Sequence, residues 1–206
     1  MCILGLVLNN SGSTTVVHLR DEKLGRPTAP PTPTSSLICG RDLQRSGTWL
    51  GWQRSHSLVA GITNVRSTLP HGPTTSSRGL LVQGLLDGTL GLTFDSLLAL
   101  ALAGQAVDLL ETYAPFNLLL VRLGGADGSS PSQALFLSNV EELQQQPAAE
   151  AGSATGSPSC SAWVAGPGPG GRAALGRVLT DGTHVIGNDS SQWEEFPLGL
   201  WASLGL

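Results

Sequence analysis

The 206-residue chain has little charge and few cysteines, and both shortages exclude classes of function. Only 13% of its residues are Asp, Glu, Lys or Arg, and the net charge is −4. With its basic residues scattered singly, we expect no nucleic acid and no anionic membrane as a partner. The three cysteines, Cys2, Cys39 and Cys160, are too few and too far apart for a disulfide framework or a zinc site, which favours a reducing compartment.

The sequence also lacks a long apolar run. The apolar start, residues 1–8, has no basic residue before it and is too short for a signal peptide. No other stretch approaches the roughly 18 apolar residues that a membrane-spanning helix needs. We therefore expect a soluble, cytoplasmic protein without an integral membrane segment. The four histidines have no metal-ligand spacing, so we expect no metal or resident cofactor.

The start of the chain predicts a β-hairpin. Residues 2–8 are an apolar run of strand length, and residues 14–19 are rich in β-branched side chains. Between them, Asn, Ser and Gly supply the residues that turns prefer. The hairpin would return the charged residues 20–26 to the beginning of the first strand. Four charges so close together stand out in this chain, and their simplest structural role is a surface cluster of ion pairs.

The rest of the chain predicts an α+β fold in one main domain, residues 1–146. A helix is expected over residues 76–86, closed by Gly88, and a longer one from an N-cap at Asp95 to about Tyr113. Residues 147–175 are mostly Ala, Gly, Ser and Pro, and we expect a disordered insertion there. Residues 176–206 would return a strand and a tail to the same domain. Further strands are expected at residues 37–42, 47–52, 58–63, 117–123 and 134–137.

Cys2 is the candidate nucleophile. Methionine before a small residue is normally removed, which would leave Cys2 with a free α-amine. That amine titrates near pH 8 (about 7.7–8.0), so it can act as the base for the thiol of the same residue. The alternative is structural: a cysteine at this position can simply begin a buried strand, because cysteine is among the most buried residue types.

Four further residues could serve such a nucleophile. A thiolate needs a cation nearby and the amine needs a carboxylate, and Arg20 and Asp21 at the end of the second strand could supply them. Asn64 and Asn188 each follow a strand and could donate hydrogen bonds to an oxyanion. For each asparagine taken alone, an Asx turn or a helix cap is the favoured explanation.

These residues resemble the family named for its Asn-Arg-Asp-Glu motif, the Transport and Golgi organisation protein 2 family. The family pattern begins Met-Cys-Ile and continues with the motif and an Arg-Pro pair. Here those elements are residues 1–3, Leu19-Arg20-Asp21-Glu22 and Arg26-Pro27. Other matches follow in the family's order. They are residues 40–42, 47–51, 63–66, 77–82, 113–118 and 182–188.

The resemblance implies an N-terminal-nucleophile-hydrolase-like αββα sandwich, with antiparallel sheets between helical layers. It implies a cytoplasmic factor, associated with the Golgi or mitochondria, in Golgi organisation, protein secretion and haem or lipid handling. Its ligand would be a small molecule: haem, a lipid or an amide. The alternative is a cysteine amidohydrolase in which Cys2 is the nucleophile, Arg20 and Asp21 are its partners, and Asn64 and Asn188 bind oxyanion or substrate.

Two differences from the family pattern shape these expectations. Leu19 stands where the motif has Asn, and the chain ends soon after the Asn188 match. We therefore expect a family domain that is incomplete at its C-terminus. Both differences would harm catalysis more than binding, which favours the binding factor. The two hypotheses also differ in one requirement, because a hydrolase needs Cys2 and a binding protein should tolerate Cys2→Ala.

Overall fold

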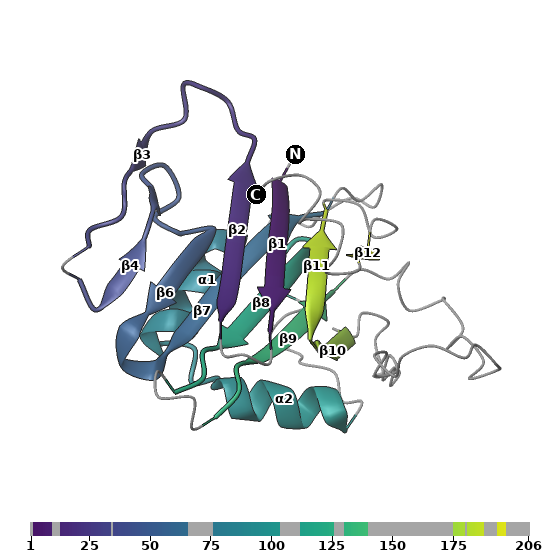
Figure 1. The fold of residues 1–206 in the computed structure, drawn as a ribbon. Helices are drawn as coiled ribbons and strands as arrows, with labels where there is room; N and C mark the ends of the chain where they lie inside the picture. Colours follow the sequence, from purple (N-terminus) through teal and green to yellow (C-terminus); the bar gives the residue numbers. More distant parts are fainter. Residues whose placement is uncertain are drawn as a thin grey trace.

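Antiparallel β-sheets and two helices make up the part of the chain that the computed structural model describes (Figure 1). That part comprises residues 2–9, 13–33, 35–65, 76–103, 112–125, 130–139, 175–179, 181–187 and 193–196. The α+β class expected from the sequence is therefore confirmed. None of the helices described is long and apolar enough to cross a membrane.

The predicted hairpin forms at the start of the chain. Strands β1 (Cys2–Leu8) and β2 (Thr14–Arg20) pair antiparallel, with Cys2 opposite Arg20 and Leu8 opposite Thr14. Every second residue of β1, from Cys2 to Leu8, is buried, as expected for a strand with one face on a core. The hairpin belongs to a four-stranded sheet in the order β12 (Trp193–Phe196), β11 (Gly182–Ile186), β1 and β2.

A second, six-stranded sheet is more deeply buried. All of β8 (Phe116–Arg122) except its last residue is buried, and β7 (Leu58–Asn64) is nearly so. Such continuous burial is expected of strands that are covered on both faces. The order of the sheet is β10 (Leu175–Leu179), β9 (Gln133–Ser138), β8, β7, β6 (Leu50–Gln53) and β4 (Leu37–Cys39).

A short ribbon and one 3-10 turn complete the strands. The ribbon pairs β3 (Thr28–Ala29) with β5 (Arg41–Asp42), and the 3-10 turn η1 (Arg54–His56) connects β6 to β7. The stretch predicted as one strand over residues 37–42 is thus divided between two sheets at Gly40.

One core lies between the two large sheets. Leu4, Leu6 and Leu8 of β1 cluster with residues of β8 and β9, including Leu119 and Phe136. The sheets are in tight contact at Gly61 of β7, where a Cβ would lie 2.9 Å from Cδ2 of Leu4. In Figure 1 the strands of the smaller sheet cross in front of those of the larger one.

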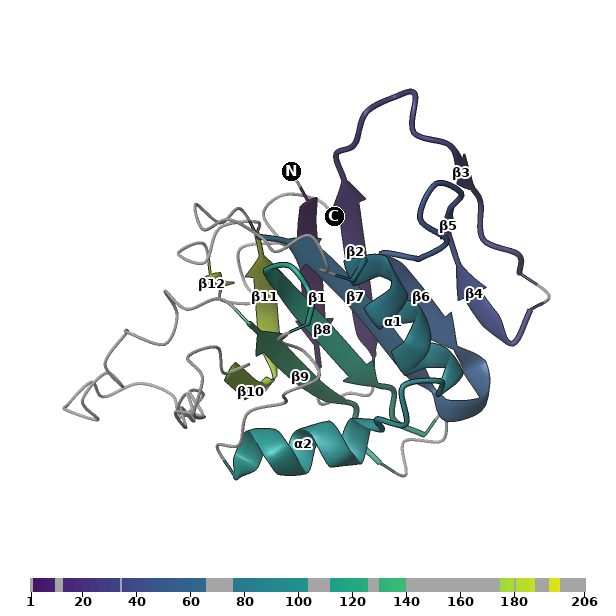
Figure 2. The ribbon, with the colours of Figure 1, turned by 180° about the vertical axis from the view of Figure 1, so that it is seen from behind.

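The second core lies between the six-stranded sheet and the helices. Figure 2 shows α1 (Arg78–Asp87) and α2 (Phe94–Leu102) on the face that points away from the hairpin. Leu81, Leu85 and Leu97 from the helices cluster there with Ile62 and Leu118 of the sheet. The described layers are therefore helix, sheet and sheet. The second helical layer of an αββα sandwich remains a prediction.

The helices differ from their predictions at two ends. The N-cap of α2 is Thr93, whose hydroxyl accepts from the Ser96 amide in a reciprocal capping box, whereas Asp95 lies in the first turn. The helix ends at Leu102, with Ala103 as its C-cap, and the predicted end at Tyr113 was wrong, because that residue forms an isolated bridge to Ser76. Residues 104–111 lie outside the described part. The first helix ends as predicted, with Gly88 left-handed at φ 78°.

The predicted insertion, residues 147–175, lies outside the described residues except for Leu175, the first residue of β10. Strands β10, β11 and β12 come from the sequence after it. The division of the chain into a main domain, an insertion and a returning segment remains a prediction.

Candidate functional site

The hairpin places Arg20 beside Cys2. The two residues face each other across β1 and β2 and so project from the same face of the sheet. Cys2 is buried at 6% exposure. The Arg20 guanidinium carbon lies 3.3 Å from the ring centroid of Trp49, and its Nη2 donates to Glu22 Oε2 at 3.4 Å. The stacking on Trp49 holds the Arg20 cation at the end of the hairpin that carries Cys2, the first residue of β1.

Asp21 lies one residue further, on the surface. The amino terminus of the chain holds the pKa of the Asp21 carboxyl below its ordinary value, through a hydrogen bond and through its charge. The sequence predicted such a contact with the α-amine of Cys2, which exists only after removal of Met1. The role of Asp21 stays a prediction, because removal of Met1 would move the amino terminus to Cys2.

The two asparagines have different outcomes. Asn64 ends β7, is half-buried and lines a pocket described below. Asn188 lies outside the described residues. Its neighbour Gly187 is held by two side chains of the six-stranded sheet, since the Gly187 carbonyl accepts from Thr63 Oγ1 at 2.9 Å and from Asn117 Nδ2 at 3.1 Å. The chain is thus anchored at the end of β7 directly before Asn188.

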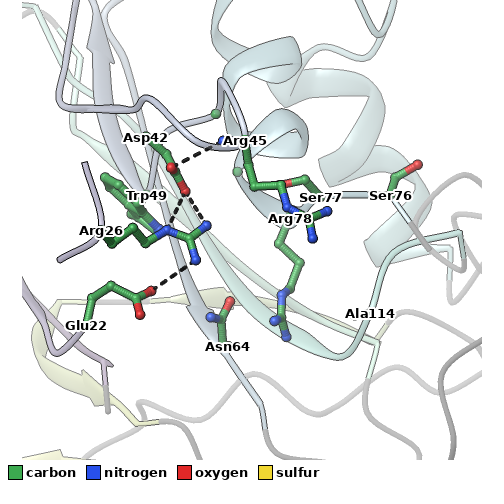
Figure 3. A pocket seen from close by; sticks show the side chains of 12 residues that line it. Glu22, Arg26, Asp42, Arg45, Trp49, Asn64, Ser76, Ser77, Arg78 and Ala114 are labelled. Atoms are coloured by element: carbon green, nitrogen blue, oxygen red, sulfur yellow. Dashed lines mark hydrogen bonds and ion pairs between the residues drawn. The ribbon is translucent and has the colours of Figure 1, made fainter. Parts of the chain in front are cut away.

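A polar pocket of about 250 Å³ opens where the hairpin end, the β5–β6 connection and the start of α1 meet (Figure 3). Trp49 and Asn64 form part of its wall, and Arg78 extends from the start of α1 toward Asn64. The described lining residues are Glu22, Arg26, Asp42, Arg45, Gly47, Trp49, Asn64, Ser76, Ser77, Arg78, Gly79 and Ala114. Cys2 is not among them.

Arg78 is the residue that sequence reasoning missed. Its Nη1 donates to the Pro115 carbonyl at 2.8 Å. Burial lowers the pKa of the Arg78 guanidinium, while an electrostatic interaction with Cys2 acts in the opposite sense. A signal was available, since Arg78 is an isolated charge at the start of an apolar helix and belongs to one of the family-like segments.

One ion-pair network supports the pocket. Arg26 donates to Asp42 Oδ2 from Nε at 3.0 Å and from Nη2 at 2.5 Å, and its Nη1 lies 3.6 Å from Glu22. Asp42 Oδ1 accepts from the amides of Gln44 and Arg45. Burial alone would raise the pKa of the Asp42 carboxyl, but Arg26 and these amides together leave it lowered.

Replacing Asp42 by asparagine should therefore lower the free energy of unfolding at pH 7 by about 2 kcal/mol, because Arg26 loses a buried charge-assisted partner. Because folding lowers the pKa of Asp42, the ion pair contributes its full stabilisation above the unfolded-state pKa of 3.8. That stabilisation is lost as the pH falls below 3.8 and through the lower pKa of the folded state. Urea unfolding at pH 7 and pH 3.5 measures both effects.

Asp95→Asn is the matched control. Asp95 also pairs with an arginine, Arg122, at 2.6 Å, but its side chain is 70% exposed. We expect a loss below about 1 kcal/mol for this exposed pair. Equal losses from the two substitutions would contradict a structural role for the buried network.

A close backbone contact between Gly47 and Gly79 joins two parts of the pocket wall. A Cβ on Gly47 would lie 2.4 Å from the backbone carbon of Gly79, and the Thr48 amide donates to the Gly79 carbonyl at 3.0 Å. This contact places the Arg45 segment against the start of α1, which carries Arg78.

A second, largely apolar cavity of about 510 Å³ adjoins the first and shares Trp49 with it. Arg20, His18 and Cys39 are among its lining residues. Burial lowers the pKa of the His18 imidazole, while a hydrogen bond to the backbone of Ile62 acts in the opposite sense. Nε2 of this imidazole is buried with no hydrogen-bond partner. The cavity can take apolar groups near a neutral imidazole.

Within the described residues no group of three His, Cys, Asp or Glu side chains could hold a metal ion. Neither Cys2 nor Cys39, the cysteines that the structure describes, is in a disulfide.

A family model described as Transport and Golgi organisation 2 matches residues 1–199 of the chain. A comparison with curated proteins finds no match. The matched range includes the hairpin, the polar pocket and every strand and helix described above.

Proposed function

Because the chain belongs to the Transport and Golgi organisation 2 family, we propose that it acts in Golgi organisation and protein secretion by binding a small molecule. The observation that carries the proposal is the polar pocket with its adjoining apolar cavity, which meet at Trp49. Ligand sites combine apolar walls with a few convergent polar groups. Here the polar groups include Asn64 and Arg78, and the apolar wall includes Trp52 and Val59.

Haem and lipids, the ligands that the family resemblance implies, each join an apolar body to a polar or charged group. The two cavities suit that combination. The apolar body would enter the larger cavity, and the polar group would reach past Trp49 into the smaller one. In this function the protein carries the molecule and does not transform it, so the thiol of Cys2 is not needed.

The test is rescue of secretion in cells that lack the protein. Wild type and Cys2→Ala should both restore transit of a secreted reporter, and Trp49→Leu, which removes the wall that both cavities share, should not. Urea unfolding of each purified variant shows whether it is folded. Failure of Cys2→Ala to restore transit would contradict a binding role and indicate that the thiol performs chemistry.

A second function, cysteine amidohydrolase, is favoured by the surroundings of Cys2. Arg20 faces Cys2 across the hairpin, Asp21 interacts with the amino terminus, and Arg78 interacts electrostatically with Cys2. After removal of Met1, the α-amine of Cys2 would take the thiol proton as Sγ attacks the amide carbonyl. The C–N bond then breaks, the proton passes to the leaving amine, and water hydrolyses the thioester. Asn64 and Asn188 would donate to the oxyanion.

Intact mass after treatment with a p-nitrophenyl acyl ester tests this second function. It predicts that Met1 is absent, that wild type gains one acyl group, and that Cys2→Ala gains none. Cys39→Ala is the matched control, because Cys39 is also a buried cysteine outside any disulfide, and it should label like wild type. Retained Met1, or labelling that does not depend on Cys2, would contradict the hydrolase.

A further inference from the structure

The polar pocket contains more positive than negative charge. Of its described lining residues, Arg26, Arg45 and Arg78 are cationic, and Glu22 and Asp42 are anionic. Both carboxylates are already engaged by Arg26, and Glu22 also accepts from Arg20. In the described part of the chain, no ion pair reaches Arg45 or Arg78.

The excess positive charge is least favourable at Arg78, because its guanidinium has lost part of its hydration. The Arg78 guanidinium is partly buried. Of its five N–H donors, one donates to the Pro115 carbonyl within the described part of the chain. Among the described residues no carboxylate pairs with this guanidinium, so the Pro115 carbonyl and the interaction with Cys2 replace only part of the hydration that burial removes. Burial correspondingly lowers its pKa. An anion in the pocket would recover that loss.

The rest of the wall is compatible with an anion. Ser77 caps α1 without a side-chain hydrogen bond to it, and the first turn of that helix has no acidic residue. Ser76 and Ser77 therefore add hydroxyl donors next to Arg78. Charge-assisted hydrogen bonds from guanidinium to carboxylate or phosphate are among the strongest in proteins.

We propose that the ligand of this pocket carries an anionic group, a carboxylate or a phosphate, that binds between Arg45 and Arg78. The inference rests on the proposed binding function and specifies the charge of what is bound. The anionic group would sit at the polar end of the two cavities, and the remainder of the molecule would pass Trp49.

Titration of the full chain with inorganic phosphate and with succinate, followed by tryptophan fluorescence, tests the proposal. We expect saturable binding that Arg78→Gln weakens about tenfold, the scale of one lost charge-assisted contact. Arg45→Gln should weaken it about threefold, and because the Arg45 side chain is exposed, this variant keeps the test independent of folding. The tighter of the two anions identifies the ligand's group.

Arg54→Gln is the control, because Arg54 stacks on Trp52 at 5.3 Å and does not line the polar pocket. It should bind both anions like wild type. Equal binding by wild type and both pocket variants, or no binding by wild type, would overturn the proposal. If a small molecule nevertheless co-purifies with wild type and is lost from Trp49→Leu, the proposed binding function is supported. In that case only the proposal that the ligand carries an anionic group is wrong.

Discussion

Gly47→Ala is expected to lower the free energy of unfolding by about 2–3 kcal/mol and to weaken anion binding in the polar pocket. The new Cβ would fall 2.4 Å from the carbon and 2.8 Å from the oxygen of Gly79. Both atoms are backbone, so no side chain can turn aside, and overpacking of this kind costs about 1–3 kcal/mol. The start of α1 must move, and Arg78 moves with it.

Gly25→Ala is the matched control, because a Cβ there meets nothing within 4 Å. We expect a change within about 0.5 kcal/mol in urea unfolding. A Gly47→Ala protein with the stability and anion affinity of wild type would show that the close contact between residues 47 and 79 does not shape the pocket.

The other large effect is expected in the core between the sheets. Leu4→Ala should lower the free energy of unfolding by about 3 kcal/mol, because Leu4 is fully buried against Gly61 and a cavity would remain. Its neighbour Ile3 lies on the opposite face of β1 and is half-buried, so Ile3→Ala should cost less than about 1.5 kcal/mol. Urea unfolding compares them. Equal losses of unfolding free energy in the two variants would contradict the arrangement in which Leu4, and not Ile3, faces the larger sheet.

The local structure that short-range patterns control was predictable. The hairpin followed from two apolar runs around a turn-forming segment, and its pairing placed Arg20 opposite Cys2 as expected. Helix α2 was less predictable at its ends. Thr93 and Asp95 are both good N-caps, and the choice depends on the reciprocal bond with Ser96. The helix was predicted to extend to Tyr113 from its apolar periodicity alone. Tyr113 instead forms a β-bridge with Ser76.

The site was predictable where neighbours in sequence determine it and not where distant segments meet. Arg20 and Asp21 could be proposed as partners of Cys2 because the hairpin returns them to the start of the chain. Arg78 was missed because its approach to Cys2 depends on how α1 packs on the sheet and on the contact between Gly47 and Gly79. The network around Asp42 was missed for the same reason, since it joins the connection after β2, which carries Glu22 and Arg26, to the end of β5.

The most direct test of the account is native mass spectrometry of the full chain purified from cells under non-denaturing conditions. The account predicts that one small molecule remains bound per chain in wild type and in Cys2→Ala, and that Trp49→Leu loses it while still folded. A wild-type protein that carries no ligand, or a ligand retained equally by Trp49→Leu, would contradict the claim that the cavities beside Trp49 are the binding site.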